Sequence, residues 1–115
     1  MLLEAVNTSL IPIKMCASVV KLDQFMPDWT LSQLEKEESD LPRTFIYRVQ
    51  FDIPFSNIPV VQVGLSGFDI DNRDSARISV LTDAITAETF NIVIKTWRNT
   101  RIYSAEISWI ALGHV

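Results

Sequence analysis

The clearest strand in the sequence is Phe45-Ile46-Tyr47-Arg48-Val49-Gln50-Phe51-Asp52-Ile53. Large apolar side chains occupy every second position, and this alternation places them on one face of a half-buried strand. Pro54 and Pro59 then bracket a loop. The same two-residue period dominates the second half of the chain, so the sequence predicts a protein built from sheets.

Five further segments show strand patterns and are separated by polar connections. They comprise residues 15–22, 60–65, 77–82, 90–96 and 102–112. Residues 69–75 are expected to form a polar loop between the third and fourth strands. Six short strands with few helical signals predict an all-β fold, namely a six-stranded antiparallel β-sandwich.

One segment departs from the strand pattern. The motif Thr30-Leu31-Ser32-Gln33 matches a helix capping box, and residues 34–38 have good helix propensity. A single helical turn is therefore expected there. The acidic run over residues 35–40 is expected to be mostly a solvated loop.

The size and charge of the chain exclude several classes of function. Its 115 residues, of which 48% are apolar, correspond to one domain with a single core. The formal net charge of -4 and the isoelectric point of about 4.8 argue against nucleic-acid binding, which needs a basic face. No apolar run approaches the roughly 20 residues that span a bilayer, so no membrane insertion is expected. The N-terminus lacks a basic n-region and is a poor signal peptide, which suggests a cytoplasmic or non-classically secreted protein.

The sequence contains few of the side chains that commonly serve in catalysis or metal binding. Cys16 and His114 are the only cysteine and histidine, which excludes the usual zinc clusters and a Cys–His nucleophile pair. A Ser–His–Asp triad would have to use His114, one residue from the C-terminus, where chains commonly fray. Residues 69–74 superficially suggest calcium, but Arg73 stands where an oxygen ligand belongs. We therefore expect no metal, no cofactor and no enzyme activity.

The connection with the most distinctive chemistry is Lys95-Thr96-Trp97-Arg98-Asn99-Thr100-Arg101-Ile102-Tyr103. It places an indole, a phenol and two guanidinium groups around a tight turn between two strands. An aromatic ring beside groups that bind hydroxyls is typical of a site that holds a sugar. Trp97 shares strand parity with Val93 and Lys95, a mixed face that predicts partial exposure. Trp109 lies in an alternating apolar strand and is expected in the core.

Three sequence blocks together form a family pattern. They are Phe51-x-x-Pro54-Phe55-x-x-x-Pro59-Val60-Val61, then Phe68-Asp69-Ile70 with Arg77, and finally Thr96-Trp97-x-Asn99-Thr100-x-x-Tyr103-Ser104-x-x-x-Ser108-Trp109-Ile110. These blocks resemble the H-type lectin family, which includes snail agglutinins specific for N-acetylgalactosamine and the C-terminal domains of slime-mould discoidins. The resemblance covers residues 15–115 as a lectin-like domain and leaves residues 1–14 as an N-terminal extension.

The resemblance implies a six-stranded antiparallel sandwich that assembles as a homotrimer, sometimes paired into a hexamer. It also implies that glycans or glycoconjugates bind at clefts between subunits, with Asp40 and Arg77 from one subunit. Trp97, Arg98 and Tyr103 would come from the next. A carboxylate and a guanidinium can bind neighbouring hydroxyl groups, while an aromatic ring can cover the C–H face of a pyranose. The function implied is a lectin for galactose- or N-acetylgalactosamine-type glycans.

The sequence departs from the snail pattern in three ways. Arg98 stands where the snail proteins have a histidine that contacts the N-acetyl group, and Glu38 replaces a glycine near Asp40. Arg98 could favour an acidic sugar or forbid the N-acetyl contact. The snail disulfide is absent because Cys16 has no partner within the chain.

Other interpretations of the same residues stay open. One is a trimerising structural or adhesion module, for example in a viral fibre, that kept the fold and lost sugar binding. A hydrolase could use Asp40 and a glutamate as a carboxylate pair, although nothing in the sequence positions such a pair. For Arg77 the alternative is a surface salt bridge with an aspartate of residues 69–74, and for Tyr103 it is packing within its strand.

Overall fold

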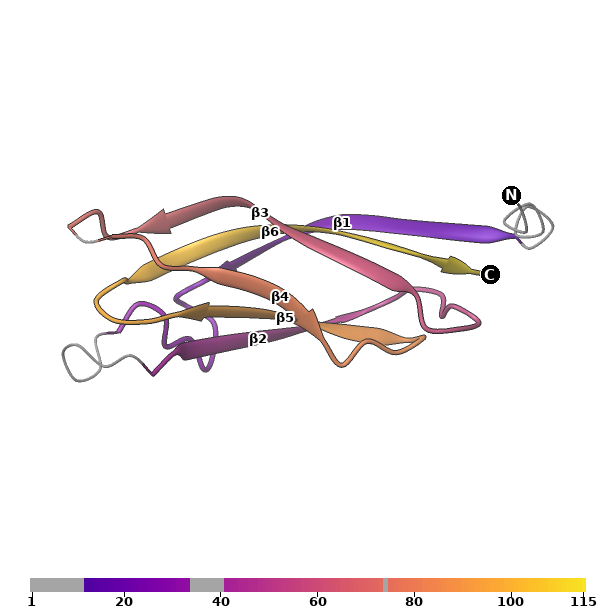
Figure 1. Cartoon of the computed structure of the whole chain (residues 1–115), viewed down its shortest axis with the longest axis horizontal. Coiled ribbons are helices and arrows are strands. Elements are labelled where there is room, and N and C mark those ends of the chain that lie inside the picture. The colour runs from indigo at the N-terminus through magenta and orange to yellow at the C-terminus, as the bar shows by residue number, and fades with distance from the viewer. Residues whose placement is uncertain (1–11, 34–40, 74) are drawn as a thin grey trace, which may run out of the picture.

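The computed structural model describes residues 12–33, 41–73 and 75–115. In this part of the chain, six antiparallel strands form two three-stranded sheets that enclose one core (Figure 1). The strands are β1 (Ile13–Asp23), β2 (Arg43–Gln50), β3 (Val60–Ile70), β4 (Ser79–Asp83), β5 (Thr89–Thr96) and β6 (Ile102–His114). One sheet has the order β1–β6–β3 and the other the order β2–β5–β4. The predicted six-stranded antiparallel β-sandwich is confirmed.

The core lies between the two sheets and follows from the alternation in the sequence. On β5, the central strand of its sheet, Phe90, Ile92 and Ile94 face inward and are fully buried. On β6, the central strand of the other sheet, Ile107 and Ala111 face them from the opposite side. Burying each large side chain contributes about 1.5–3 kcal/mol, so this inner layer drives the two sheets together.

Several strand boundaries differ from the predictions: β4 begins at Ser79 rather than at residue 77, and β1, β3 and β6 extend further than predicted. β2 ends at Gln50, although the Phe51 N–H still donates to the Glu88 carbonyl at 2.9 Å, in the position that continues the register between β2 and β5. Phe51 still fills the core, but Ile53 is 67% exposed and does not share its face. The polar loop predicted for residues 69–75 begins later than expected, because β6 is long enough to keep β3 paired as far as residue 70.

The predicted helical turn over residues 34–38 lies outside the described residues, as do Glu38 and Asp40. The capping-box residues before it form a tight turn, in which the Gln33 N–H donates to the Thr30 carbonyl at 3.2 Å. The first strand begins at Ile13, and the predicted extension over residues 1–14 falls mainly on undescribed residues, so that boundary stays a prediction. Among the described residues, the structure contains no helix with the length and apolarity of a membrane span.

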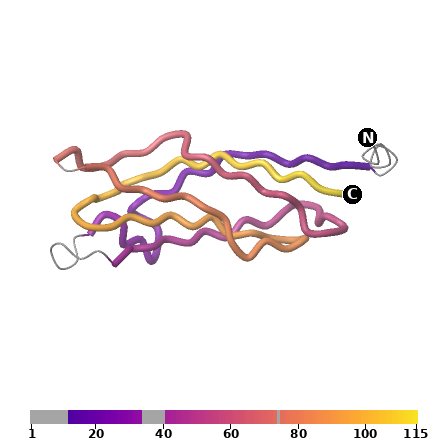
Figure 2. Tube along the Cα trace, in the orientation of Figure 1, coloured from indigo at the N-terminus to yellow at the C-terminus, as the bar shows by residue number. Residues whose placement is uncertain are grey.

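Two chain connections meet at one end of the sandwich. The β3–β4 connection and the residues 97–101, here called the β5–β6 turn, lie at the end opposite the C-terminus (Figures 1 and 2). The Asp71 N–H donates to the Arg101 carbonyl at 3.0 Å, and the Thr100 hydroxyl donates to the Ser75 carbonyl at 2.7 Å. These bonds join the two connections and bring the residues singled out in the sequence to one place.

Candidate functional site

The β5–β6 turn has a constrained backbone. Arg98 adopts a φ of 58°, a left-handed conformation that costs a non-glycine residue about 1–2 kcal/mol. The Arg43 Nη2 group donates to the carbonyl of Arg98 at 2.8 Å and to that of Thr100 at 2.7 Å. Two charge-assisted hydrogen bonds thus hold the turn in this shape and present the Arg98 side chain to solvent.

Arg43 also ties this turn to a second loop. Its Nη1 group donates to the carbonyls of Leu31, at 3.2 Å, and Gln33. The arginine is only 6% exposed, and a charge this deeply buried persists only where polar groups replace its water. The backbone carbonyls supply that replacement, so Arg43 fixes both loops relative to β2.

Trp97 lies at the edge of a shallow depression on the outer face of the β2–β5–β4 sheet. The depression has a volume of about 410 Å³ and is lined by Pro42, Ser79, Lys95 and Trp97. This is the size of a small-ligand site, for which roughly 300–1,000 Å³ is usual. The indole is half-buried, so the partial exposure predicted from strand parity is confirmed. We call this feature the Trp97 depression.

Arg77 lies just before β4 and contacts the same turn within its own chain. Its Nη1 group donates to the Thr100 hydroxyl and to the Ser75 carbonyl, both at 3.3 Å. Its own carbonyl accepts a hydrogen bond from the Thr96 hydroxyl. The alternative salt bridge with an aspartate of the β3–β4 connection is not formed by the described residues, in which Asp71 pairs with Arg73 instead.

Tyr103, at the start of β6, is half-buried and donates its hydroxyl to Asp71 Oδ2 at 3.5 Å. Asp71 also accepts hydrogen bonds from the side chain and the backbone N–H of Arg73. These bonds, together with the nearby charges of Arg73 and Arg101, hold the pKa of the Asp71 carboxyl well below its ordinary value. The tyrosine therefore faces an ionised carboxylate.

The structure thus gathers four of the five predicted site residues, Arg77, Trp97, Arg98 and Tyr103, at one end of the sandwich. Trp97 follows β5 and lies on the outer face of one sheet, whereas Tyr103 belongs to the other sheet. Among the described residues, no hydrogen bond joins the indole to Arg77 or Tyr103. Asp40 lies outside the described residues, so its part in the site stays a prediction.

Several residues at this end were not assigned a role from the sequence. The sequence could have placed Lys95 on the same face as Trp97, because the two residues are two positions apart along the strand direction. The sequence could not have placed Ser79 there, because its position opposite Lys95 depends on the register between β4 and β5. Phe25 is 86% exposed in the loop after β1, where Gln24 donates its N–H to the Tyr103 carbonyl at 2.9 Å. An exposed phenylalanine cannot be told from a buried one by sequence alone.

The described residues contain no cluster of three histidine, cysteine or acidic side chains that could hold a metal ion. Cys16 is a free, partly exposed thiol. Trp109 packs against the core as expected, with its ring centroid 5.2 Å from that of Phe90 and 6.0 Å from that of Phe51.

Comparison with known proteins agrees with the sequence pattern. The H-type lectin domain family model matches residues 46–112. A protein of Fuscovulum blasticum called ATP synthase subunits region ORF 7, a name that states no activity, is 40% identical over 74 residues, which are 64% of this chain and 64% of that protein.

The fold also resembles solved structures. Two structures of discoidin II from Dictyostelium discoideum, one of the recombinant and one of the wild-type protein, each superpose with a TM-score of 0.72 at 20% identity. Each match covers 90% of this chain but only 38% and 37% of the discoidin chains, so the present chain corresponds to a little over a third of them. At this identity the likeness concerns the fold alone. The family match, which spans more than half of the sequence, shows that the chain belongs to the H-type lectin domain family.

Proposed function

We propose that this protein is a carbohydrate-binding lectin that recognises galactose- or N-acetylgalactosamine-type glycans and catalyses no reaction. The observation that carries the proposal is the half-exposed indole of Trp97 beside a depression of about 410 Å³. An indole offers the C–H face of a pyranose a flat apolar partner and keeps a polar N–H for a hydroxyl. Membership of a lectin domain family supports the same function.

The proposed binding residues are Asp40, Arg77, Trp97, Arg98 and Tyr103. In the described part of one chain, Trp97 and Tyr103 belong to different sheets, which supports a site completed by a neighbouring protomer. We assign Arg77 and Asp40 to one protomer of the site, as donor and acceptor for neighbouring hydroxyl groups. Arg98 lies on the β5–β6 turn, whose carbonyls are held by Arg43, and a preorganised turn loses little entropy on binding.

The proposed assembly is a homotrimer, alone or paired as a hexamer. An extensive apolar surface on the outer face of the β1–β6–β3 sheet supports assembly. Its large side chains are 39–68% exposed and are Ile13, Met15, Val19, Val60, Ile110 and Leu112. Together they leave roughly 500–600 Å² of apolar surface, which is at the upper end for a monomer and about two thirds of the roughly 800 Å² that one partner contributes to a standard interface.

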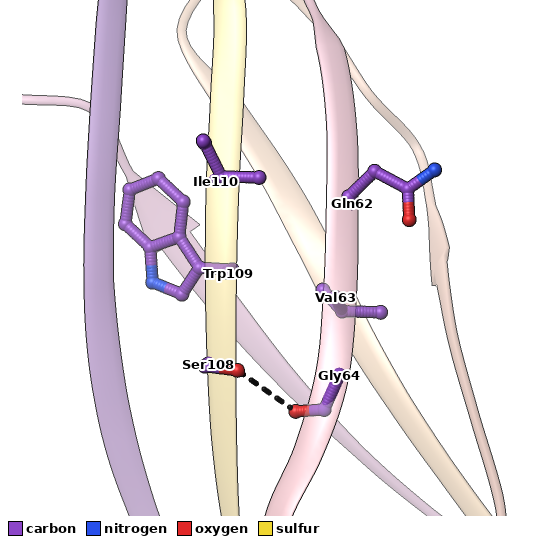
Figure 3. A pocket seen from close by; sticks show the side chains of 6 residues that line it. All are labelled: Gln62, Val63, Gly64, Ser108, Trp109 and Ile110. Atoms are coloured by element: carbon purple, nitrogen blue, oxygen red, sulfur yellow. Dashed lines mark hydrogen bonds between the residues drawn. The ribbon is translucent and has the colours of Figure 1, made fainter.

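The same surface contains a hollow of about 320 Å³ between β3 and β6 (Figure 3). Figure 3 shows Gly64 and Ser108 beside each other there, joined by a hydrogen bond of 3.4 Å from the serine hydroxyl to the glycine carbonyl. These small residues leave room beside Ile110, into which a protruding apolar side chain of another protomer fits.

Assembly would matter for function because a single shallow site binds weakly. A millimolar dissociation constant corresponds to only about -4 kcal/mol. Several sites in one rigid assembly raise the apparent affinity for clustered glycans by roughly 10² to 10⁴ without any new contact. Adhesion or agglutination is the activity that such an arrangement would produce.

The second candidate is a structural assembly module that no longer binds sugar. The observation that favours it is the apolar outer face of the β1–β6–β3 sheet, which would serve assembly whether or not a glycan binds at the other end. The two functions make different predictions for glycan binding and the same prediction for the oligomeric state.

A glycan array, combined with light scattering, tests the proposal. We expect the wild type to be an oligomer that binds galactose-type glycans, and Trp97→Ala and Arg77→Ala to lose most of that signal. Arg48→Ala is the control, because Arg48 is exposed on the same sheet and its Nε group donates to the Asn91 side chain at 3.5 Å, away from the Trp97 depression. An oligomer with an empty array would favour the structural module, and equal signals from all variants would exclude the assigned residues.

A further inference from the structure

Lys95 is a cation on the outer face of the β2–β5–β4 sheet, two residues before Trp97. It lies on the central strand, between Thr44 on β2 and Ser79 on β4. The pleat of β5 directs residues 95 and 97 to the same side, and both side chains line the Trp97 depression. A ligand stacked on the indole would therefore lie within reach of the ammonium group.

The surroundings of this ammonium group are mostly apolar. The next row of the same face consists of Ile46, Val93 and Leu81, in register across the three strands. Val93 is only 4% exposed although it points away from the core, because its two neighbours cover it. Lys95 therefore lies between an apolar row and an indole, where water screens its charge less than on an open polar surface.

Among the described residues, Lys95 has no counter-charge. In the described part of the chain, no carboxylate and no hydrogen-bond acceptor lies within bonding distance of its ammonium group. The nearest acidic residue that the structure describes along this face, Asp83, is two rows away and accepts a hydrogen bond from Asn91 at 3.1 Å. Surface lysines are commonly solvated without a partner, but this one is half-buried and lines a depression beside an exposed aromatic ring.

We infer that Lys95 determines the specificity of the proposed sugar site, and that the glycan bound there carries an anionic group, either a sulfate or a carboxylate. The inference rests on the proposed function, in which Trp97 covers one face of the sugar ring. The ammonium group of Lys95 then binds the anionic substituent of that ring or of the next one. Lysine suits this role because it acts as a compact point charge with three donors.

The charge of the whole protein makes a local cation necessary for such a ligand. The formal net charge of -4 repels an anionic glycan at long range. Salt screens this repulsion beyond about 8–10 Å, whereas a contact with a half-buried ammonium group is screened much less. A neutral sugar over Lys95 would remove water from the cation and return no opposite charge, so the pocket discriminates in favour of the acidic glycan.

The test is the binding of a matched set of ligands by the full chain: a neutral galactoside, the same galactoside with a sulfate, and the same galactoside extended by a carboxylated sugar. We expect the wild type to bind one or both acidic forms roughly threefold to tenfold more tightly than the neutral form, as one partly screened charge contact allows. High salt reduces this ratio. Lys95→Gln removes the preference for the acidic forms, whereas Lys95→Arg retains it.

Arg48→Gln is the matched control, because Arg48 is an exposed cation on the same outer face, two rows from Lys95, and does not line the Trp97 depression. The inference is overturned if the wild type binds neutral and acidic forms equally, or if Lys95→Gln keeps the preference, and the lectin function stands in both cases. A wild-type protein that binds no glycan at all would overturn the lectin function itself, and this inference with it. A preference for only one of the two acidic forms, lost in Lys95→Gln, supports the inference and identifies the anion.

Discussion

Replacing Arg43 by alanine is expected to destabilise the fold more than any other single change to a charged residue of β2. The guanidinium group donates to four backbone carbonyls, those of Leu31, Gln33, Arg98 and Thr100. Hydrogen bonds to a charged group contribute about 1.5–3 kcal/mol each, but truncation also removes the charge and with it the cost of keeping that charge out of water. Water can reach part of the space left behind, so the simple sum is an upper limit.

We therefore expect Arg43→Ala to lower the free energy of unfolding by about 3–5 kcal/mol, the usual cost of breaking a buried charged network. For a domain of this length, that loss lowers the melting temperature by roughly 12–20 °C. The stability of Arg43→Lys is expected to fall between those of the wild type and Arg43→Ala. A single ammonium group cannot reach the carbonyls of both loops, as the planar guanidinium group of arginine does. The left-handed Arg98 backbone should loosen in both variants, since it loses the bond that holds it.

Urea denaturation followed by tryptophan fluorescence measures this effect, with Arg48→Ala as the control. Arg48 is an exposed arginine on the same strand, and its removal is expected to change stability by no more than about 0.5 kcal/mol. The denaturant slope should stay constant, which shows that the midpoint reports stability. An Arg43→Ala protein within about 1 kcal/mol of the Arg48→Ala protein would refute the reasoning, because the four carbonyls would then not depend on the guanidinium.

Two further predictions concern the C-terminal strand and the β3–β4 connection. Gly113→Ala should lower the free energy of unfolding by about 1–3 kcal/mol, because a Cβ there would lie 2.8 Å from the buried ring of Phe55. Gly64→Ala is the control and should be near neutral in denaturation experiments, because its Cβ would meet nothing closer than 3.6 Å. An NMR titration should find the Asp71 carboxyl still charged below its ordinary pKa of 3.8, since Arg73 favours the ionised form. The contribution of the ionised Asp71 carboxyl to stability is thus present above pH 3.8 and is lost only as the pH falls through the lower pKa of the folded state. Arg73→Ala should return the pKa of Asp71 toward 3.8. A wild-type midpoint near 3.8, or equal costs for the two glycine variants, would contradict these expectations.

The strands could be predicted because the pattern that indicates each one lies entirely within its own segment of sequence. A period of two in apolar residues marks which side chains face the core, and this pattern is complete within a single segment. The inward alternation of Phe90, Ile92 and Ile94 on β5 is one example. The pattern was weaker at strand ends, where Phe51 lies in the core just beyond the end of β2 but Ile53, two residues later, is exposed.

The candidate site was predictable only in part, because a local pattern shows which residues share a turn but not which distant residues join them. Trp97, Arg98 and Tyr103 lie within seven residues of one another, so their grouping at a turn was visible in the sequence. The approach of Arg77 to the Thr100 hydroxyl joins residues 23 positions apart and was not predicted, because the family resemblance implied only that Arg77 belongs to the site. Asp40 was expected from the same resemblance and stays a prediction.

The sequence by itself determined the sandwich, the turn that carries the indole, and the common side of Lys95 and Trp97, because these depend on the periodicity of single strands. Only the tertiary structure decided which residues of other strands and loops pack around them. Arg43 reaches carbonyls 10 and 12 residues away on one side and 55 and 57 residues away on the other. Contacts of this kind depend on the register and packing of separate strands, which no local pattern encodes, and they decide the shape of the depression and the charge within it.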